Sequence, residues 1–276
     1  GPNGAGKTTT IKMLTGLVPP SGGRGRVAGF DVRTQAKEIK RRIGYMSQLF
    51  SLYGDLTVGE NIGFFSGLYG VPRPRRAERR DWVLRMAGLE GQRDRLTGDL
   101  SLGWKQRLAL GCAVLHEPPI LFLDEPTSGV DPISRRSFWD LIYTLAEGGT
   151  TVFVTTHYME EAEYCNRLAL MNRGKLIALD SPEGLRRSRQ RPLFDLRTSD
   201  GPAAADLLED APGVEQVGLF GRNLHVEVAD AAAARKDLPA LLAARGIRVE
   251  SMEEITPSLE DVFLSLVEEA GGAPVD

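Results

Sequence analysis

A glycine-rich loop at the start of the chain constrains the fold more than any other feature. Residues 1–8 read GPNGAGKT and fit the pattern G-x-x-x-x-G-K-[ST] at every fixed position. Glycines let the backbone curl so that its N–H groups point inward at phosphate oxygens. Lys7 supplies a charge for the outer phosphates, and the Thr8 hydroxyl can ligate Mg²⁺. The next segment, Thr9–Leu17, is compatible with a helix whose N-terminal dipole favours an anion. The loop therefore predicts a nucleoside triphosphate site, with these candidate binding residues: Gly1, Asn3, Gly4, Gly6, Lys7, Thr8 and Thr9.

A short apolar run that ends in two acids predicts a buried parallel strand. Ile120–Leu123 lies between two prolines and the pair Asp124 and Glu125. Ligands in open α/β sheets bind at the carboxyl ends of strands, so Asp124 is placed to hold Mg²⁺ directly or through water. Glu125 is suited to orient or activate an attacking water. The alternative interpretation is an acidic helix N-terminus ahead of Pro126.

Two further polar residues follow strand-like segments. Thr150–Thr155 is followed shortly by His157, and Arg42–Met46 is followed by Gln48. His157 could contact a phosphate at the same sheet edge, although a lone histidine is usually structural. The amide of Gln48 could touch Mg²⁺ or water, and an ordinary surface glutamine is the alternative.

Composition and charge exclude several other classes of protein. The chain has 276 residues, 42% of them hydrophobic, and a formal net charge of −3, which is ordinary for a globular protein. This charge gives no basic surface for nucleic acid. The two cysteines, Cys112 and Cys165, are too few for a disulfide framework and favour a reducing cytosol. No apolar stretch reaches the roughly 20 residues that a membrane span needs.

Together these motifs resemble the nucleotide-binding subunit of ATP-binding cassette (ABC) transporters. The resemblance covers about residues 1–191 and includes a signature segment near Ser101 and a turn from Ser128 to Asp131. It implies an α/β P-loop ATPase cassette over residues 1–191, with a helical subdomain at about 49–105. An accessory domain at residues 192–276 would follow.

The resemblance also implies roles for the candidate residues. Lys7 and the loop amides bind the β- and γ-phosphates of ATP, while Thr8, Gln48 and Asp124 attend Mg²⁺. The catalytic residues would be Glu125, which acts on the hydrolytic water, His157, which contacts the γ-phosphate, and Gln48. In this family the signature segment of one copy completes the ATP site of another. The residues assigned to that contact are Ser101 and Gly103 on the partner's nucleotide, and Ser128 and Asp131 at the dimer interface.

The signature segment departs from the family pattern Leu-Ser-Gly-Gly-Gln. It reads Leu100-Ser101-Leu102-Gly103-Trp104. Leu102 replaces a glycine, which affects how closely the backbone can approach a phosphate there. Trp104 replaces the glutamine, and both a structural role and an altered ATP contact stay open.

The sequence begins on the first glycine of the phosphate loop. The strand expected before the loop, and any aromatic residue that stacks on adenine, would then lie outside the sequence. We expect such a chain to fold less stably or bind ATP more weakly than a longer parent.

Two stretches of the predicted helical subdomain have alternative interpretations. Several apolar residues could form a dock for a membrane permease, or could belong to the core: Phe50, Leu52, Tyr53, Phe64 and Phe65. The arginine-rich stretch at residues 73–80 is interpreted as a solvated helix entry and not as a nucleic-acid site.

After residue 191 the pattern becomes β-α-β-β-α-β, which is typical of a ferredoxin-like α+β domain. The segments are strand 193–197, helix 203–209, strands 214–219 and 224–228, helix 231–244 and strand 247–252, with a closing helix at 258–268. His225 is interpreted as an outward residue on its strand.

The resulting hypothesis is an ATP-hydrolysing subunit that powers export through a separate permease. It would sit at the cytoplasmic face of the plasma membrane and pair with a second cassette, as a homodimer or in a tandem arrangement, with no nucleic-acid partner. Two alternatives stay open: a non-transport ATPase acting on ribosomes or DNA, and a degenerate cassette that binds ATP without hydrolysing it.

Overall fold

The computed structural model describes residues 1–48, 52–188 and 191–270. Contacts divide the chain into two compact units, Asn3–His157 and Tyr158–Asp276, the latter joined by Gly1 and Pro2. This division falls well before the domain boundary predicted at residue 191, which stays a prediction. Within the described ranges, no helix has both the length and the apolar character needed to cross a membrane.

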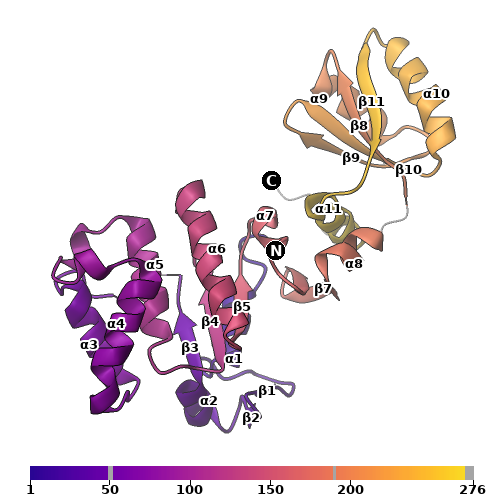
Figure 1. Ribbon diagram of the computed structural model, residues 1–276. Coiled ribbons are helices and arrows are strands. Elements are labelled where there is room, and N and C mark those ends of the chain that lie inside the picture. The colour runs from indigo at the N-terminus through magenta and orange to yellow at the C-terminus, as the bar shows by residue number, and fades with distance from the viewer. Residues whose placement is uncertain (49–51, 189–190, 271–276) are drawn as a thin grey trace. The chain divides into compact units, whose positions relative to one another are not determined.

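The first unit is built on a parallel sheet (Figure 1). Its strands are β3 (Ile43–Met46), β4 (Ile120–Asp124) and β5 (Thr151–Thr155), with β4 in the centre. The central strand is apolar because both of its faces are covered, as expected for a parallel sheet. The register aligns Asp124 with Thr155, so the polar ends of these two strands lie side by side. The strands predicted from the apolar runs are confirmed.

Helices and a small hairpin complete this part of the unit. The elements are α1 (Lys7–Leu14), β1 (Arg26–Val27), β2 (Phe30–Asp31), α2 (Ala36–Arg42) and α6 (Pro132–Glu147). Apolar side chains of α1, the hairpin segment and α2 form one cluster with the sheet residues Ile43 and Phe122, made up further of Ile11, Val27, Val32 and Ile39.

A helical layer contains α3 (Val58–Leu68), α4 (Arg76–Ala87) and α5 (Leu102–Ala113), with three short 3₁₀ turns at Arg73–Arg75, Glu90–Gln92 and Thr97–Asp99. A capping box starts α3, in which the Thr57 hydroxyl and the Glu60 carboxylate each accept the other's backbone N–H. Gly111 lets α4 and α5 approach closely, because a Cβ there would lie 2.5 Å from a methyl carbon of Val83. The helical subdomain therefore has its own core.

The arginine-rich stretch is not entirely solvated, which corrects its interpretation. Arg79 is buried and donates hydrogen bonds to the carbonyls of Leu115 (3.0 Å) and Val114 (3.1 Å). It also pairs with Glu117 at 3.1 Å. The Arg79 guanidinium donates to carbonyl oxygens just beyond the end of α5, where a positive charge is favourable. The burial of Arg79 therefore has a structural reason.

His116 gives the first unit a predicted pH dependence. Its ring stacks on Tyr69 with centroids 4.3 Å apart, and Nε2 lies 3.0 Å from the Ile43 carbonyl. Its Nδ1 is buried without a hydrogen-bond partner among the described residues. Burial lowers the pKa of His116 below its ordinary value of 6.5. Below about pH 6.5 the unfolded chain therefore binds a proton that the folded chain resists, and stability falls.

We expect His116→Phe to remove this part of the pH dependence while keeping the stacked ring. Between pH 7.5 and 5.5, the melting temperature of the wild type should fall more steeply than that of the variant. If the melting temperatures of the two proteins depend on pH equally over this range, the protonation of His116 does not change on unfolding.

The second unit starts with α7 (Met159–Ala162), the hairpin β6 (Leu168–Asn172) and β7 (Lys175–Asp180), and α8 (Pro182–Arg187). A four-stranded antiparallel sheet follows, in the order β11-β8-β10-β9. Its elements are β8 (Leu193–Thr198), α9 (Gly201–Glu209), β9 (Val214–Phe220), β10 (Asn223–Val228), α10 (Ala231–Ala243) and β11 (Val249–Ile255). This order is that of a ferredoxin-like domain, as predicted.

The last helix, α11 (Leu259–Glu269), accounts for the division of the chain into two units and corrects one expectation. Its apolar residues Val262 and Phe263 share a core with Leu168 and Leu185, which is why contacts group residues 158–188 with the C-terminal part. His225 does not point outward into solvent, because its Nδ1 lies 2.6 Å from an oxygen of Asp261 on α11. A strand pattern alone does not reveal a helix that covers the second face of the sheet.

Candidate active site

The phosphate loop lines a pocket of about 520 Å³ in the first unit, a size typical of small-molecule sites. The pocket brings together most of the predicted nucleotide-binding and catalytic residues. Its lining is Asn3, Gly4, Ala5, Gly6, Lys7, Thr8, Thr9, Gln48, Glu125, Ser128 and His157.

The loop has the backbone that an anion site needs. Gly4 (φ 77°) and Gly6 (φ 98°) adopt left-handed conformations that other residues rarely take. Helix α1 begins directly after Gly6, at Lys7, so its first N–H groups and its dipole lie at the pocket. This arrangement favours a bound phosphate.

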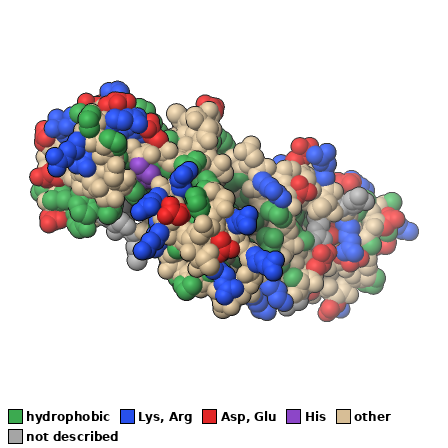
Figure 2. All heavy atoms as spheres, turned by 90° about the horizontal axis from the view of Figure 1, so that it is seen from below, with side chains coloured by type: hydrophobic (Ala, Val, Ile, Leu, Met, Phe, Trp, Pro, Cys, Tyr) green, Lys and Arg blue, Asp and Glu red, His purple; other side chains and the backbone are tan. Residues whose placement is uncertain are grey.

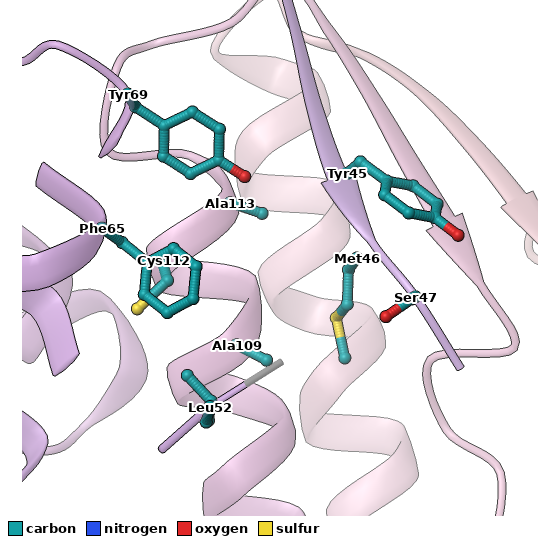
Figure 3. A pocket seen from close by; sticks show the side chains of 9 residues that line it. All are labelled: Tyr45, Met46, Ser47, Leu52, Phe65, Tyr69, Ala109, Cys112 and Ala113. Atoms are coloured by element: carbon teal, nitrogen blue, oxygen red, sulfur yellow. The ribbon is translucent and has the colours of Figure 1, made fainter. Parts of the chain in front are cut away.

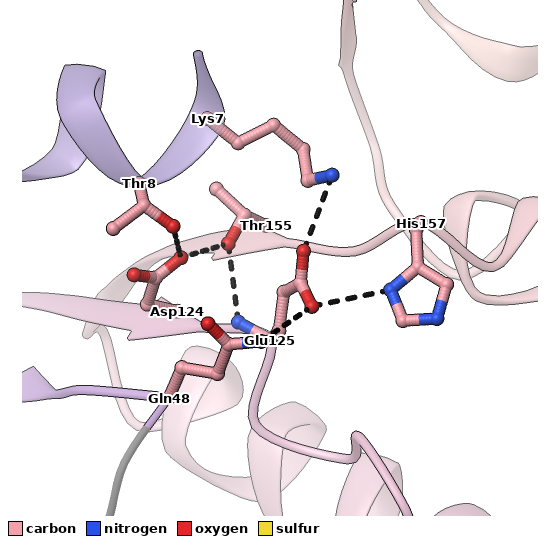
Figure 4. A network of polar contacts seen from close by, with 7 residues as sticks. All are labelled: Lys7, Thr8, Gln48, Asp124, Glu125, Thr155 and His157. Carbon is pink, nitrogen blue, oxygen red and sulfur yellow. Dashed lines mark hydrogen bonds and ion pairs between the residues drawn. The ribbon is translucent and has the colours of Figure 1, made fainter. Parts of the chain in front are cut away.

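Glu125 is the centre of the polar network (Figure 4). One carboxylate oxygen lies 3.2 Å from Lys7 Nζ. The other accepts a hydrogen bond from the amide of Gln48 (3.1 Å) and lies 3.2 Å from Nδ1 of His157. Lys7 and Glu125 are only 8% and 7% exposed, so their charges are largely removed from water. This buried ion pair therefore links the phosphate loop to the end of β4.

Asp124 lies beside Glu125 but has different partners. Its Oδ1 accepts hydrogen bonds from the hydroxyls of Thr8 (3.1 Å) and Thr155 (2.7 Å). A carboxylate and a hydroxyl are hard oxygen ligands of the kind that Mg²⁺ prefers. The described residues contain no group of three or more His, Cys, Asp and Glu that could hold a metal alone. The donors thus fit a magnesium ion that is shared with substrate phosphates.

The backbone of Glu125 is strained, and Thr155 secures it. Glu125 has a φ of 47°, a left-handed conformation that costs a non-glycine residue about 1–3 kcal/mol. Its N–H points at both the carbonyl and the hydroxyl of Thr155, each 3.1 Å away. Sequence reasoning missed Thr155 as a site residue. The available signal was a hydroxyl residue at the end of the strand next to the acidic one.

Several predicted site residues do not line this pocket. The residues absent from its lining, among those described, are Gly1, Ser101, Gly103, Asp124 and Asp131, and Gly1 groups with the other unit. Asp124 nevertheless contacts the pocket residue Thr8. Asp131 caps α6 by accepting the Ser134 N–H at 2.9 Å. That backbone hydrogen bond lowers the pKa of Asp131.

The signature segment instead packs on the start of α6. A Cβ at Gly103 would lie 3.1 Å from Ser134, so glycine has a packing reason there. The Leu102 side chain reaches within 3.4 Å of a Cβ built on Gly129, and it is still 39% exposed. The signature segment therefore contacts the turn after Glu125, while its Leu102 side chain stays partly exposed to solvent.

The contacts of Trp104 favour a structural role for this residue over an altered contact with ATP. It is half-buried and packs against the core of the helical subdomain. Arg107 lies over its ring at 5.0 Å, and the ring passes 3.5 Å from a Cβ built on Gly88. These contacts join α5 to the end of α4.

The apolar residues proposed as a dock divide into two groups. Phe65 is buried and Leu52 packs against the helical core, so both belong to the core. Tyr53 and Phe64 are 46% and 44% exposed, and their rings meet edge to face at 4.9 Å. Phe50 lies outside the described residues.

A second pocket lies between β3 and the helices α3 and α5 (Figure 3). It measures only about 30 Å³, enough for one or two water molecules. Burial raises the pKa of its Cys112 thiol far above the ordinary value, so the thiol stays protonated. This pocket is a packing defect of the core.

Comparison with known proteins agrees with the geometry. The ABC transporter family model matches residues 1–128. A model of the DrrA1-3-like ATP-binding protein C-terminal domain matches residues 181–267. The chain is 36% identical over 271 residues to the daunorubicin resistance ATP-binding protein DrrA2 of Streptomyces coeruleorubidus, covering 96% of this chain and 84% of that protein. The chain belongs to the ABC transporter ATP-binding family.

A further relative and a solved structure are similar to parts of the chain. It is 52% identical over 186 residues to the probable multidrug ABC transporter ATP-binding protein YbhF of Escherichia coli K12. That match covers 67% of this chain and 32% of YbhF, so the chain spans about a third of that relative. A solved dimeric structure of the ATP-binding cassette MJ0796 with ADP and Pi is similar with a TM-score of 0.58 and 27% identity, covering 65% of this chain and 82% of that one. The predicted fold class, an ABC cassette with an α+β C-terminal domain, is confirmed.

Proposed function

We propose that this chain binds and hydrolyses ATP to power export through a separate membrane permease. The observation that carries the proposal is the network around Glu125, which joins the phosphate-loop lysine, Gln48 and His157 through one carboxylate. Family membership and the DrrA-like C-terminal match support an export role. Drug resistance and multidrug transport are named for its relatives, and the cargo of this chain is left unassigned.

The reaction would use each part of the pocket differently. The loop amides and Lys7 bind and neutralise the β- and γ-phosphates. Mg²⁺, held by Thr8 and Asp124 with Gln48 nearby, would supply charge neutralisation at the phosphates. Glu125 orients the attacking water and accepts its proton, while His157 lies within reach to contact the γ-phosphate. Nucleotide binding must release Lys7 from Glu125, which frees the carboxylate for this task.

A second cassette would complete the site. Ser101 and Gly103 stay outside the pocket of their own chain, and Ser101 and Leu102 are exposed. Such a surface suits a contact with the nucleotide of another copy, with Ser128 and Asp131 near the interface. The dimeric MJ0796 structure is the relative that supports this arrangement.

The exposed aromatic pair Tyr53 and Phe64 is the proposed contact with the permease, at the cytoplasmic face of the membrane. We expect Tyr53→Asp and Phe64→Asp to weaken binding to the permease by about tenfold or more, because aromatic anchors dominate such interfaces. Retention of the permease on the tagged chain, isolated from membranes of the source cell, measures this. Tyr143→Asp, at another exposed aromatic residue, is the matched control.

The same isolation separates the export role from a non-transport role. Recovery of membrane proteins supports export, and recovery of ribosomes or nucleic acid would contradict it. On the face drawn in Figure 2, the described Lys and Arg side chains lie close together in places and beside Asp and Glu in others. The formal net charge of −3 over the whole sequence argues against a nucleic-acid role, because nucleic-acid-binding proteins carry an excess of clustered basic residues.

A further inference from the structure

We propose that Thr155 is a positioning residue for the hydrolysis reaction. Its hydroxyl ties the metal-side carboxylate of Asp124 to the backbone of Glu125. The inference rests on the proposed ATPase function and adds a residue that neither the loop motif nor the acidic pair contains.

The hydrogen-bond directions at Thr155 follow from its surroundings. The hydroxyl accepts the N–H of Glu125 at 3.1 Å, so its own proton is available for a different partner. It donates this proton to Oδ1 of Asp124 at 2.7 Å. The β-branched side chain is stiff at χ1 and buried at the end of β5, so the hydroxyl has little freedom to turn away.

The strained backbone of Glu125 gives this hydroxyl its importance. Glu125 adopts a φ of 47°, and its N–H finds two acceptors, both on Thr155. This conformation turns the chain sharply after β4 and aims the carboxylate at Lys7 and His157. A looser backbone would let the carboxylate leave the position in which it meets the attacking water.

The same hydroxyl restrains Asp124. Oδ1 of Asp124 receives hydrogen bonds from both Thr8 and Thr155. The Thr8 hydroxyl can bind a cation through its lone pairs while it still donates to Asp124, so the two hydroxyls orient this carboxylate together. Loss of the Thr155 hydroxyl therefore affects both carboxylates, through Asp124 directly and through the backbone of Glu125.

Thr155→Val and Thr155→Ser test this proposal. Valine keeps the shape and removes the hydroxyl, while serine keeps the hydroxyl. We expect Thr155→Val to lower kcat about 10- to 100-fold, since small misplacements of catalytic groups have effects of this size, and to raise KM for ATP only by the factor lost from the magnesium gain. Thr155→Ser should stay within about threefold of the wild type. Thr151→Val, at the exposed start of the same strand, is the matched control.

A binding measurement provides a readout that does not depend on turnover. A fluorescent ATP analogue is titrated in EDTA and in Mg²⁺. For Thr155→Val, affinity in EDTA should match the wild type, while the gain in affinity from Mg²⁺ should shrink. Thr155→Ala provides a second hydroxyl-free variant if Thr155→Val does not fold, and melting temperatures verify folding.

Two results would overturn the role of Thr155: a folded hydroxyl-free variant with wild-type kcat and magnesium gain, or an equal loss in Thr155→Ser. If the wild type and Thr151→Val release no phosphate, the proposed ATPase function fails instead. The magnesium gain alone then decides the role of Thr155, and an unchanged gain contradicts it.

Discussion

Replacing Glu125 with Gln is expected to reduce phosphate release from ATP at least about 100-fold while ATP still binds. Glutamine has nearly the same shape and still accepts hydrogen bonds, but it cannot take the proton of the attacking water. The change also removes the charge that pairs with Lys7 at 3.2 Å. ATP affinity should therefore be equal to or higher than that of the wild type. Turnover and equilibrium binding, measured on the same preparation, separate these two effects.

The matched control for Glu125→Gln is Glu160→Gln, which makes the same chemical change at an exposed residue. It should hydrolyse ATP at the wild-type rate. A Glu125→Gln variant that also keeps the wild-type rate would contradict the assignment of Glu125 as the base.

Lys7→Met is expected to have the second large effect. It should lower both the free energy of unfolding and the affinity for ATP. Without its lysine, the Glu125 carboxylate stays largely buried and keeps Gln48 and His157 as its partners among the described residues. Breaking a buried ion pair by removing one partner costs about 3 kcal/mol of unfolding free energy. ATP binding should weaken at least about 100-fold, because the outer phosphates lose their cation, and each factor of ten is about 1.4 kcal/mol.

The double variant Lys7→Met/Glu125→Gln tests this explanation. It removes both charges, so denaturant unfolding without nucleotide should recover most of the lost stability. ATP binding should stay weak, because the lysine is still missing. If the double variant is as unstable as Lys7→Met, the ion pair is not the cause of the loss.

The sequence predicts the strands and the phosphate loop well because their signals are local. Ile120–Leu123 is apolar throughout because β4 is covered on both faces. The fixed glycines of the phosphate loop indicate the left-handed backbone conformation that the loop adopts. The order of the C-terminal elements predicts the ferredoxin-like sheet for the same reason, since alternating strands and helices are visible along the chain.

The contacts that depend on distant segments could not be predicted in this way. The role of Thr155 depends on the register between β4 and β5, and Arg79 is buried only because α5 ends beside it. The burial of His225 depends on α11, which lies 36 residues further along at Asp261. In each case the local pattern is ordinary, and the partner that gives the residue its role comes from tertiary packing.

Phosphate release from ATP by the purified wild-type chain, with Mg²⁺ and then with excess EDTA, tests the central claim most directly. The proposed site predicts saturable release in Mg²⁺ that stops in EDTA, because the loop and Asp124 act on a magnesium-bound nucleotide. Saturable ATP binding without any magnesium-dependent release would contradict the claim that this pocket hydrolyses ATP.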